Sequence, residues 1–327
     1  MPIAEKIKPD AEPTATPGGS VWIPGGTYTM GSDHHYPEEA PAHRVSVDGF
    51  FMDRHLVTNR QFAAFVAATK YKTVAERPLD RAIFPGLSAA ELAPGSMVFK
   101  PPKHKVTTND FRQWWAWKPG ACWRHPEGKT SAIATRLDHP VVHIAYEDAQ
   151  AYAAWAGKAL PTEAEWECAA RGGLEGAEFT WGHEFTPDGR HMANSWQGNF
   201  PNENLNLDGY ETTSPVGAFP ANGYGLFDMA GNVWEWTTDW YTDRHRQAAA
   251  KPCCIPANPR NENRELSFDP QQPDVKIPRK VLKGGSFLCA PNYCRRYRPA
   301  ARHPQMIDSG TSHIGFRCIT RTNHDVT

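Results

Sequence analysis

The chain has 327 residues, and its 35 Lys and Arg residues against 36 Asp and Glu residues give a formal net charge of −1. A charge this close to zero argues against nucleic acid as a partner, because nucleic-acid binding needs a basic face. Apolar runs stay well short of the roughly 18 residues that span a membrane, so no membrane partner is expected. The 29 Pro, 26 Gly and 12 Trp residues predict a loop-rich chain with aromatic anchors, not a helical bundle.

The N-terminal residues 1–19 carry Pro, Thr, Ala and acidic side chains without an apolar period, so they are predicted to form a flexible leader. The leader lacks the apolar core of a secretory signal. Ordered structure is predicted from Val21 onward, as a strand, a Gly turn and a second strand over 21–32. The alternation of Val45 and Val47 with polar residues predicts a further strand.

Three helices are expected, and two of them start with a capping box. Thr58 stands three residues before Gln61, and Thr162 stands three residues before Glu165, which is the spacing that lets side chain and backbone cap each other. Gly residues end the second and third helices. The predicted helices cover residues 58–69, 147–156 and 162–171.

The rest of the sequence predicts short strands and long loops. The expected fold class is therefore α+β, a single loop-rich domain with little regular secondary structure. Composition does not break within 20–322, which predicts one domain there and a short tail at 323–327. The polar, Pro-rich stretch 244–279 is the most loop-like internal segment.

The chain has an odd number of cysteines, which favours a reducing compartment over a disulfide framework, so a cytoplasmic location is expected. Their spacing is not that of a zinc ribbon. The adjacent pair Cys253 and Cys254 is a poor disulfide candidate, because such a bridge is strained. The seven cysteines are Cys122, Cys168, Cys253, Cys254, Cys289, Cys294 and Cys318.

Cys289 and Cys294 are five residues apart in an arginine-rich segment, and positive charge favours thiolate over thiol. Such a pair can be a redox dithiol, a site for a soft metal, or a nucleophile with its resolving partner. The alternative is that both are buried structural cysteines. The neighbouring cations are Arg295, Arg296, Arg298 and Arg302.

Oxygen-rich stretches offer a second kind of chemistry. Asp228 and Glu235 bracket a Gly-rich turn, and a hard cation such as Ca²⁺ takes carboxylate and backbone carbonyl oxygens. The spacing does not match an EF-hand loop. Further oxygen ligands are offered by the segments 194–198 and 208–210. A weaker metal candidate, for which a solvated loop is the favoured reading, combines His34, His35 and His43 with Glu38 or Glu39.

Many segments of the chain resemble the formylglycine-generating enzymes, the sulfatase-modifying factor family. The two cysteines after Gly-Gly-Ser are the element specific to the oxidising enzymes, and the variant around them, with the Cys-Cys at 253–254, resembles actinobacterial members. The fold implied is an α+β variant of the C-type-lectin-like fold. The matching segments are PGGTYTMGS at 24–32, DRHLVTNRQFAAFV at 53–66, CWRHPEG at 122–128, HPVVHIAYEDAQAYAAWAGKALPTEAEWECAARGG at 139–173, ANSWQGNFP at 193–201, PVGAFPANGYGLFDMAGNVWEWTTDW at 215–240, KGGSFLC at 283–289, CRRYRPAAR at 294–302 and HIGFRC at 313–318.

The resemblance implies an oxidase that converts the cysteine of a Cys-x-Pro-x-Arg motif in sulfatases to Cα-formylglycine, with O2 as co-substrate. It implies Cu(I) held by Cys289 and Cys294, with Ser286 beside the oxygen site and Trp234 as a wall of that pocket. The implied partner is an unfolded or nascent sulfatase segment, and a monomer is expected.

The resemblance also implies two calcium sites. The first would use Asn194 and Asp208 with the carbonyls of Ser195 and Tyr210. The second would use Asp228 and Glu235 with the carbonyls of Gly231 and Val233.

The sequence departs from the secreted animal members of the family, which carry two disulfides. Three of their four cysteine positions are Ala153, Ala170 and Pro299 here, which leaves Cys318 without its partner. Two other functions are alternatives to the oxidase. One is a non-catalytic lectin-like binding module, which the cysteine pair argues against. The other is a sulfoxide synthase of thiohistidine biosynthesis, which carries an additional N-terminal helical bundle.

Overall fold

The computed structural model describes residues 19–83, 85–90, 92–245 and 255–322. Its α-helices are α1 (Asn59–Thr69), α2 (Tyr146–Trp155) and α3 (Glu163–Arg171), so the three predicted helices are confirmed to within a residue or two at each end. None of the helices in these described ranges is long and apolar enough to cross a membrane. The predicted leader and tail lie almost wholly outside the described residues, as do Cys253 and Cys254.

The helix ends follow the signals in the sequence. The Thr58 hydroxyl accepts a hydrogen bond from the Gln61 N–H, and the Gln61 side chain accepts one from the Thr58 N–H. Thr162 and Glu165 form the same reciprocal cap at α3. Gly172 ends α3 in a left-handed conformation, which costs glycine no steric strain.

Short strands and five 3-10 helices make up the rest of the regular structure in the described residues, and the strands there form one four-stranded, one three-stranded and two two-stranded sheets. The expected strands near Val21 and Val45 are present, but β1 pairs with β4 and β2 pairs with β3, so the first two strands do not form a hairpin. The strands are β1 (Ser20–Ile23), β2 (Gly26–Met30), β3 (His43–Val47), β4 (Phe50–Asp53), β5 (Gly95–Phe99), β6 (Trp115–Pro119), β7 (Trp234–Trp240), β8 (Arg279–Lys283), β9 (Arg302–Met306), β10 (Ile314–Gly315) and β11 (Ile319–Arg321).

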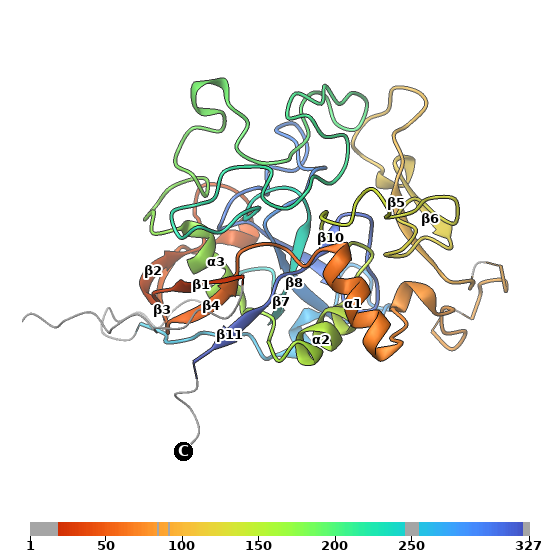
Figure 1. The fold of residues 1–327 in the computed structure, drawn as a ribbon, viewed down its shortest axis with the longest axis horizontal. Helices are drawn as coiled ribbons and strands as arrows, with labels where there is room; N and C mark the ends of the chain where they lie inside the picture. The colour runs from red at the N-terminus through yellow and green to blue at the C-terminus, as the bar shows by residue number, and fades with distance from the viewer. Residues whose placement is uncertain (1–18, 84, 91, 246–254, 323–327) are drawn as a thin grey trace, which may run out of the picture.

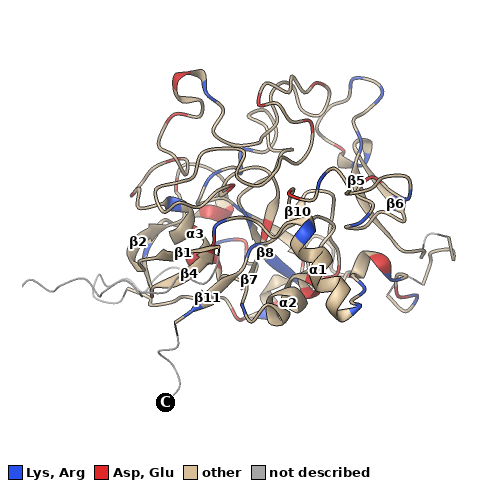
Figure 2. Cartoon of the chain, in the orientation of Figure 1, with Lys and Arg blue, Asp and Glu red and all other residues tan. Residues whose placement is uncertain are grey.

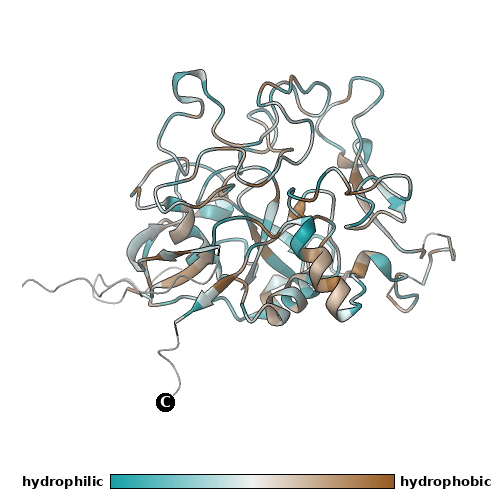
Figure 3. Cartoon of the chain, viewed as in Figure 1, coloured by the Kyte–Doolittle hydropathy of each residue, from teal (hydrophilic) through white to brown (hydrophobic). Residues whose placement is uncertain are grey.

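Long loops connect these elements, as the α+β, loop-rich expectation required. Residues 172–233, green to cyan in Figure 1, contain one short 3-10 helix, Pro187–Gly189, as their regular element. The described parts of the loop-like stretch are 244–245 and 255–279, and the second of them contains the 3-10 helix Arg264–Ser267. Apolar residues gather in the central strands and helices, whereas the outer loops are largely polar (Figure 3). Basic and acidic residues are interspersed over the fold (Figure 2), in keeping with the near-zero net charge.

The four-stranded sheet, in the order β10-β7-β8-β9, has two chemically different faces. Side chains alternate along a strand, so paired residues share a face. Trp236, Leu282 and His303 are in register on one face, which packs into a large aromatic core. Glu235, Lys283 and Arg302 are in register on the opposite face.

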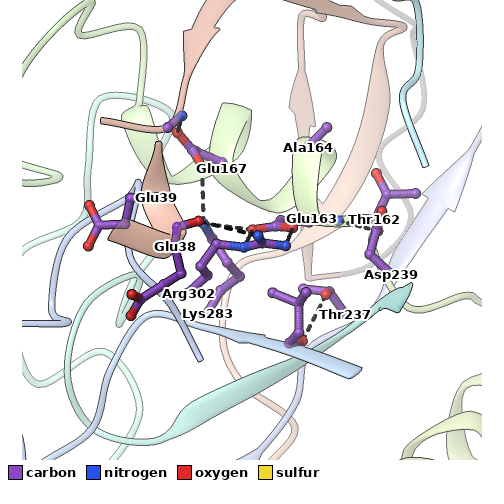
Figure 4. A network of polar contacts seen from close by, with 12 residues as sticks. Glu38, Glu39, Thr162, Glu163, Ala164, Glu167, Thr237, Asp239, Lys283 and Arg302 are labelled. Carbon is purple, nitrogen blue, oxygen red and sulfur yellow. Dashed lines mark hydrogen bonds and ion pairs between the residues drawn. The ribbon is translucent and has the colours of Figure 1, made fainter. Parts of the chain in front are cut away.

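The second face of this sheet carries a buried ion network beneath α3 (Figure 4). Arg302 makes a two-pronged contact with Glu163, with its Nε 2.8 Å and its Nη2 2.7 Å from the two carboxylate oxygens. The Lys283 Nζ lies 3.0 Å from Glu167, which Arg171 also contacts at 2.7 Å. These pairs tie β8 and β9 to α3, directly before the chain enters the turn that follows Lys283.

Candidate functional site

The turn after β8 places the predicted copper ligands. Gly284 and Gly285 both have positive φ, and a Cβ on Gly285 would lie 2.9 Å from the carbonyl oxygen of Arg296. Only glycine allows this close approach. The turn therefore packs Ser286 and Cys289 against the segment that begins at Cys294.

The two cysteines meet at this turn. The Sγ atoms of Cys289 and Cys294 are 3.0 Å apart, and neither cysteine is in a disulfide. Cys289 is buried, whereas Cys294 is partly exposed. The Cys289 sulfur also accepts a hydrogen bond from the Ser286 N–H at 3.4 Å. The backbone holds both residues, because Cys289 N–H donates to the Ser286 carbonyl at 2.9 Å and Cys294 N–H donates to the Ala290 carbonyl at 3.0 Å.

The pair is electrostatically asymmetric. A hydrogen bond from the Cys289 thiol, followed by the charge of Arg296, lowers the pKa of Cys294 to about 7. Burial raises the pKa of Cys289 well above its ordinary value, and the thiolate of Cys294 adds to this effect. The partly exposed sulfur of Cys294 therefore ionises more readily than the buried sulfur of Cys289.

Aromatic side chains belong to the core cluster against which the cysteines pack. Trp234 is buried in the same core cluster as Cys289 and Tyr297, and it stacks on His303 with ring centroids 5.3 Å apart. Burial lowers the pKa of His303 to about 3, so this ring is neutral. On the chain between the cysteines, Tyr293 stacks on Phe200 at 4.4 Å. The structure thus brings Cys289, Cys294 and Ser286 together, and Trp234 belongs to the same core cluster as Cys289.

The first set of predicted calcium ligands, Asn194, Ser195, Asp208 and Tyr210, is called the first oxygen cluster. The amide Nδ2 of Asn194 donates to a backbone carbonyl, but its Oδ1 is buried without a hydrogen-bond partner. The Nε2 of Gln197 donates both to the Ser195 carbonyl and to Asp208, which is 2.7 Å away. The Ser195 carbonyl oxygen and an Asp208 carboxylate oxygen thus both face the Gln197 amide nitrogen, and the Asn194 Oδ1 is a further buried oxygen without a partner. Such oxygens fit a hard cation.

The second set, Asp228, Gly231, Val233 and Glu235, is called the second oxygen cluster. Its Glu235 carboxylate is already bound by the guanidinium of Arg317, with the Nε at 2.7 Å and the Nη2 at 2.8 Å. Trp166 donates a further hydrogen bond to Glu235 at 2.9 Å. The Asp228 carboxylate accepts from the Gly217 N–H at 2.8 Å, and burial raises its pKa.

The two oxygen clusters adjoin each other. Asn232, from the turn of the second cluster, donates its N–H to the Asn194 carbonyl at 2.8 Å. A Cβ on Gly231 would lie 2.1 Å from that same carbonyl oxygen, so only glycine fits there.

The weaker metal candidate does not assemble. His35 lies 3.7 Å from Glu178, His43 packs against His245, and Glu38 and Glu39 form ion pairs with arginines. Within the ranges that the structure describes, no group of three or more His, Cys, Asp or Glu side chains is arranged to hold a metal ion. The cysteine pair and the mixed amide, carbonyl and carboxylate clusters are not groups of that kind.

The partners of the charged residues could not be predicted from the sequence. Arg317 forms an ion pair with Glu235 of the second oxygen cluster, and Gln197 donates hydrogen bonds to Ser195 and Asp208 of the first. Arg296, noted only as local positive charge, has a defined carboxylate partner in Glu38. The partners are 82 residues apart in the first case and 258 residues apart in the last, so no local pattern connects them.

The chain is similar to a known protein family and to several known proteins. Residues 5–322 match the Sulfatase-modifying factor enzyme 1-like domain family. The formylglycine-generating enzyme of Mycobacterium tuberculosis is 55% identical over 300 residues, covering 91% of this chain and 96% of that protein. The enzyme of the same name from Thermomonospora curvata is 46% identical over 323 residues, covering 97% of this chain and 98% of that protein.

Among solved structures, PvdO from Pseudomonas aeruginosa has a TM-score of 0.60 at 23% identity, covering 93% of this chain and 94% of that one. That likeness concerns the fold. The family match spans nearly the whole chain, and the two enzymes named above are identical to this chain at about half of the aligned positions. The chain therefore belongs to the family of sulfatase-modifying factor enzyme 1-like domains, that of the formylglycine-generating enzymes.

Proposed function

We propose that this protein oxidises the cysteine of a Cys-x-Pro-x-Arg segment in sulfatases to Cα-formylglycine, with O2 as the oxidant. The observation that carries the proposal is the pair of free sulfurs 3.0 Å apart, one buried and one partly exposed, on a turn tied to the core. The membership of the formylglycine-generating enzyme family supports it. A non-catalytic binding module would not need two converging free thiols.

We propose Cu(I) as the metal that this pair binds. Two thiolate sulfurs suit a soft d10 cation better than a hard one, and the thiol of Cys294 ionises readily. When bound, Cu(I) supplies the electron transfer to O2 that the side chains of a protein cannot supply. Cys289 and Cys294 would hold it, the Ser286 N–H orients the sulfur of Cys289, and Trp234 keeps water from the buried side.

We propose that the substrate approaches from the side of Cys294, because Cys289 is buried. A cysteine inside a folded sulfatase could not reach this turn, so the segment would be unfolded or nascent. The five described cysteines are free, which supports a cytoplasmic location. We propose that the protein acts as a monomer.

We propose that the first oxygen cluster binds Ca²⁺, because it contains a buried oxygen without a partner. A cation there would link two loops that no strand ladder connects. The second oxygen cluster stays a prediction of the family resemblance, since its carboxylates already have protein donors.

The test of the proposed reaction is mass spectrometry of a Cys-x-Pro-x-Arg peptide after incubation with the protein, copper, air and a thiol reductant. A mass loss of about 18 Da marks replacement of the thiol by an aldehyde. Cys289→Ser and Cys294→Ser should each abolish product, because an alcohol oxygen cannot replace thiolate on Cu(I). Cys122→Ser is the matched control, since this buried free thiol lies outside the pair. Turnover by both pair variants at the rate of the control would sink the proposal.

A further inference from the structure

Within the mixed charge distribution of the molecule, the antiparallel pair β5 and β6 and the loops beside it form a basic region (Figure 2). We call residues 95–129 the basic segment; it has seven Lys and Arg residues against two Asp and Glu residues, an excess of five positive charges. The rest of the chain has 28 Lys and Arg residues against 34 Asp and Glu residues, an excess of six negative charges. The near-zero net charge of the whole chain therefore conceals a local separation of charge.

The uncompensated part of this charge lies on the loop that follows β5, residues 100–106, which we call the lysine loop. Its three lysines, Lys100, Lys103 and Lys105, are all exposed. Among the residues that the structure describes, none of these lysines forms an ion pair with a carboxylate, and the exposed Glu203 on a neighbouring segment does not pair with them either. The lysine loop therefore presents positive charge that is free to attract an acidic group.

The first end of the lysine loop is fixed close to the cysteine pair. The backbone N–H of Lys100 donates a hydrogen bond to the Trp114 carbonyl at 2.8 Å. The buried ring of Trp114 packs edge-on against Tyr293, with ring centroids 5.7 Å apart. Tyr293 directly precedes Cys294, so this chain of contacts joins the loop to the partly exposed cysteine.

The other end of the loop is joined to the same place by a second set of contacts. Val106 donates its N–H to the Asn202 side chain at 2.7 Å, and the Asn202 Nδ2 donates to the Val106 carbonyl at 3.0 Å. The segment of Asn202 is bound in turn to Asn292, whose Nδ2 donates to the Phe200 carbonyl at 3.1 Å and whose Oδ1 accepts from the Phe200 N–H at 3.3 Å. One intervening segment thus separates the lysine loop from the chain between the cysteines.

A substrate segment at Cys294 can reach the lysine loop. Hydrogen-bonded neighbouring segments lie about 5 Å apart, so one intervening segment places the loop on the order of 10 Å from the chain between the cysteines. An extended polypeptide spans roughly 3.3–3.6 Å per residue, so residues about three to six positions beyond the cysteine motif cover that distance. The flanks of the motif, not the motif itself, therefore meet the lysines.

We propose that the lysine loop binds acidic residues in the flanks of the substrate's cysteine motif. The inference rests on the proposed function and adds a charge preference to its substrate. Lysine carries a compact, strongly hydrated charge on a flexible stem, which suits attraction to an unfolded acidic chain without a fixed geometry. Such attraction raises the rate of encounter and weakens as salt is added.

The arginines of the basic segment favour an acidic polypeptide over nucleic acid as the occupant. Phosphate groups are recognised best by the planar fork of a guanidinium. Both arginines of the segment already have carboxylate partners, since Arg112 lies 2.8 Å from Asp110 and Arg124 lies 3.7 Å from Glu76. The unpaired cations that remain on the lysine loop are lysines.

The test measures peptide binding to the protein by fluorescence anisotropy. Two labelled peptides carry the motif with serine in place of its cysteine, so that no turnover occurs, and are flanked on both sides by four Asp or by four Asn residues. At an ionic strength of roughly 20 mM the protein should bind the Asp peptide about tenfold more tightly, the size expected of a few exposed ion pairs. At roughly 0.5 M salt the preference should shrink to less than about twofold.

A matched pair of double variants assigns the preference to the loop. Lys103→Gln with Lys105→Gln should reduce the preference at low salt to less than about threefold. Lys70→Gln with Lys276→Gln removes the same charge from two exposed lysines outside the basic segment and should keep the preference. Thermal unfolding checks that both variants are folded. An unchanged preference in the loop variant, or an equal loss in both variants, would overturn the inference.

Two further measurements separate the remaining outcomes. Tighter binding of a mixed-sequence single-stranded RNA than of the Asp peptide, lost in the loop variant, would assign the loop to nucleic acid and overturn the inference. The cysteine forms of both peptides are then assayed for oxidation. If the protein oxidises them but binds both flanks equally at low salt, only the inference fails; if it oxidises neither, the proposed function fails whatever the binding data show.

Discussion

The two oxygen clusters lie side by side in the same loop region, and the same resemblance predicted calcium in both, yet the structure gives them different electrostatics. In the first cluster, the Asn194 Oδ1 is buried without a partner. In the second, the Glu235 carboxylate forms an ion pair with Arg317, and both side chains of this pair are almost fully buried. An irregular loop can therefore be fixed by a guanidinium from a distant part of the chain, here the connection between β10 and β11, or it can leave its oxygens open to a metal ion.

The difference between the clusters has a simple origin. A buried carboxylate needs a compensating charge, which an arginine or a divalent cation can provide. Arg317 lies between the two halves of the second cluster, because its Nη2 also donates to the carbonyls of Phe227 at 2.9 Å and Asp228 at 3.2 Å. The first cluster has one carboxylate, Asp208, and the nearest protein donors to it are uncharged amides.

Removing the carboxylate of the second cluster should have the largest effect on stability. Glu235→Ala leaves the Arg317 guanidinium buried without its counter-charge and the Trp166 indole N–H without its acceptor. The free energy of unfolding should fall by about 3–5 kcal/mol, measured by urea denaturation. Glu175→Ala breaks the exposed pair with Arg44 and should cost about 1 kcal/mol or less.

The same experiment distinguishes whether Arg317 or a bound cation is the partner that stabilises the Glu235 carboxylate. If Arg317 is the partner, the loss in Glu235→Ala is the same with and without a calcium chelator. A loss that shrinks markedly in the presence of chelator would instead assign the second cluster to a bound cation.

Calcium removal should have an intermediate effect, and it should act through the first cluster. At a calcium concentration of about 100 times the dissociation constant, binding stabilises the fold by about 2.7 kcal/mol. The chelator should therefore lower the melting temperature of the parent, and Asp208→Asn should abolish this response. The control is Asp188→Asn, because Asp188 is exposed and has a left-handed backbone conformation that Asn also tolerates. This variant should keep the response of the melting temperature to chelator. A parent that melts identically with and without chelator would contradict calcium binding.

The smallest effect is expected from the same substitution in the second cluster. Asp228→Asn keeps the size of the side chain and one acceptor for the Gly217 N–H, and it removes a carboxylate that burial disfavours. The free energy of unfolding should change by about 1 kcal/mol or less, and the response to chelator should remain. Loss of the chelator response in Asp228→Asn, as in Asp208→Asn, would show that the clusters are alike after all.

The sequence predicted the parts of this protein whose causes are local. The three helices could be predicted because each carries some of the local signals, namely a capping box, an apolar period or a terminal glycine, and these act within about four residues. The cysteine pair was also found, since residues five apart on one turn can meet without help from distant elements. The family resemblance supplied Ser286 and Trp234; the structure places Ser286 against Cys289 and Trp234 in the same core cluster as Cys289.

The strand pairing could not be predicted in the same way. The strands are short, and the three-stranded sheet joins β1 and β4 from the start of the chain with β11 from its end (Figure 1). Such pairing is decided by which apolar faces the whole core can bury, not by the residues of one strand.

The sequence by itself determined the loop-rich α+β character, the helices and the pair of thiols, because each follows from residue type and short spacing. Only the tertiary structure decided which charge faces which group: Arg296 meets Glu38, Arg317 meets Glu235, and Asn194 keeps an open oxygen. The physical reason is that a buried charge is stabilised by whatever opposite charge the fold brings within a few ångströms. Contacts across 82 to 258 residues leave no mark in the order of the chain.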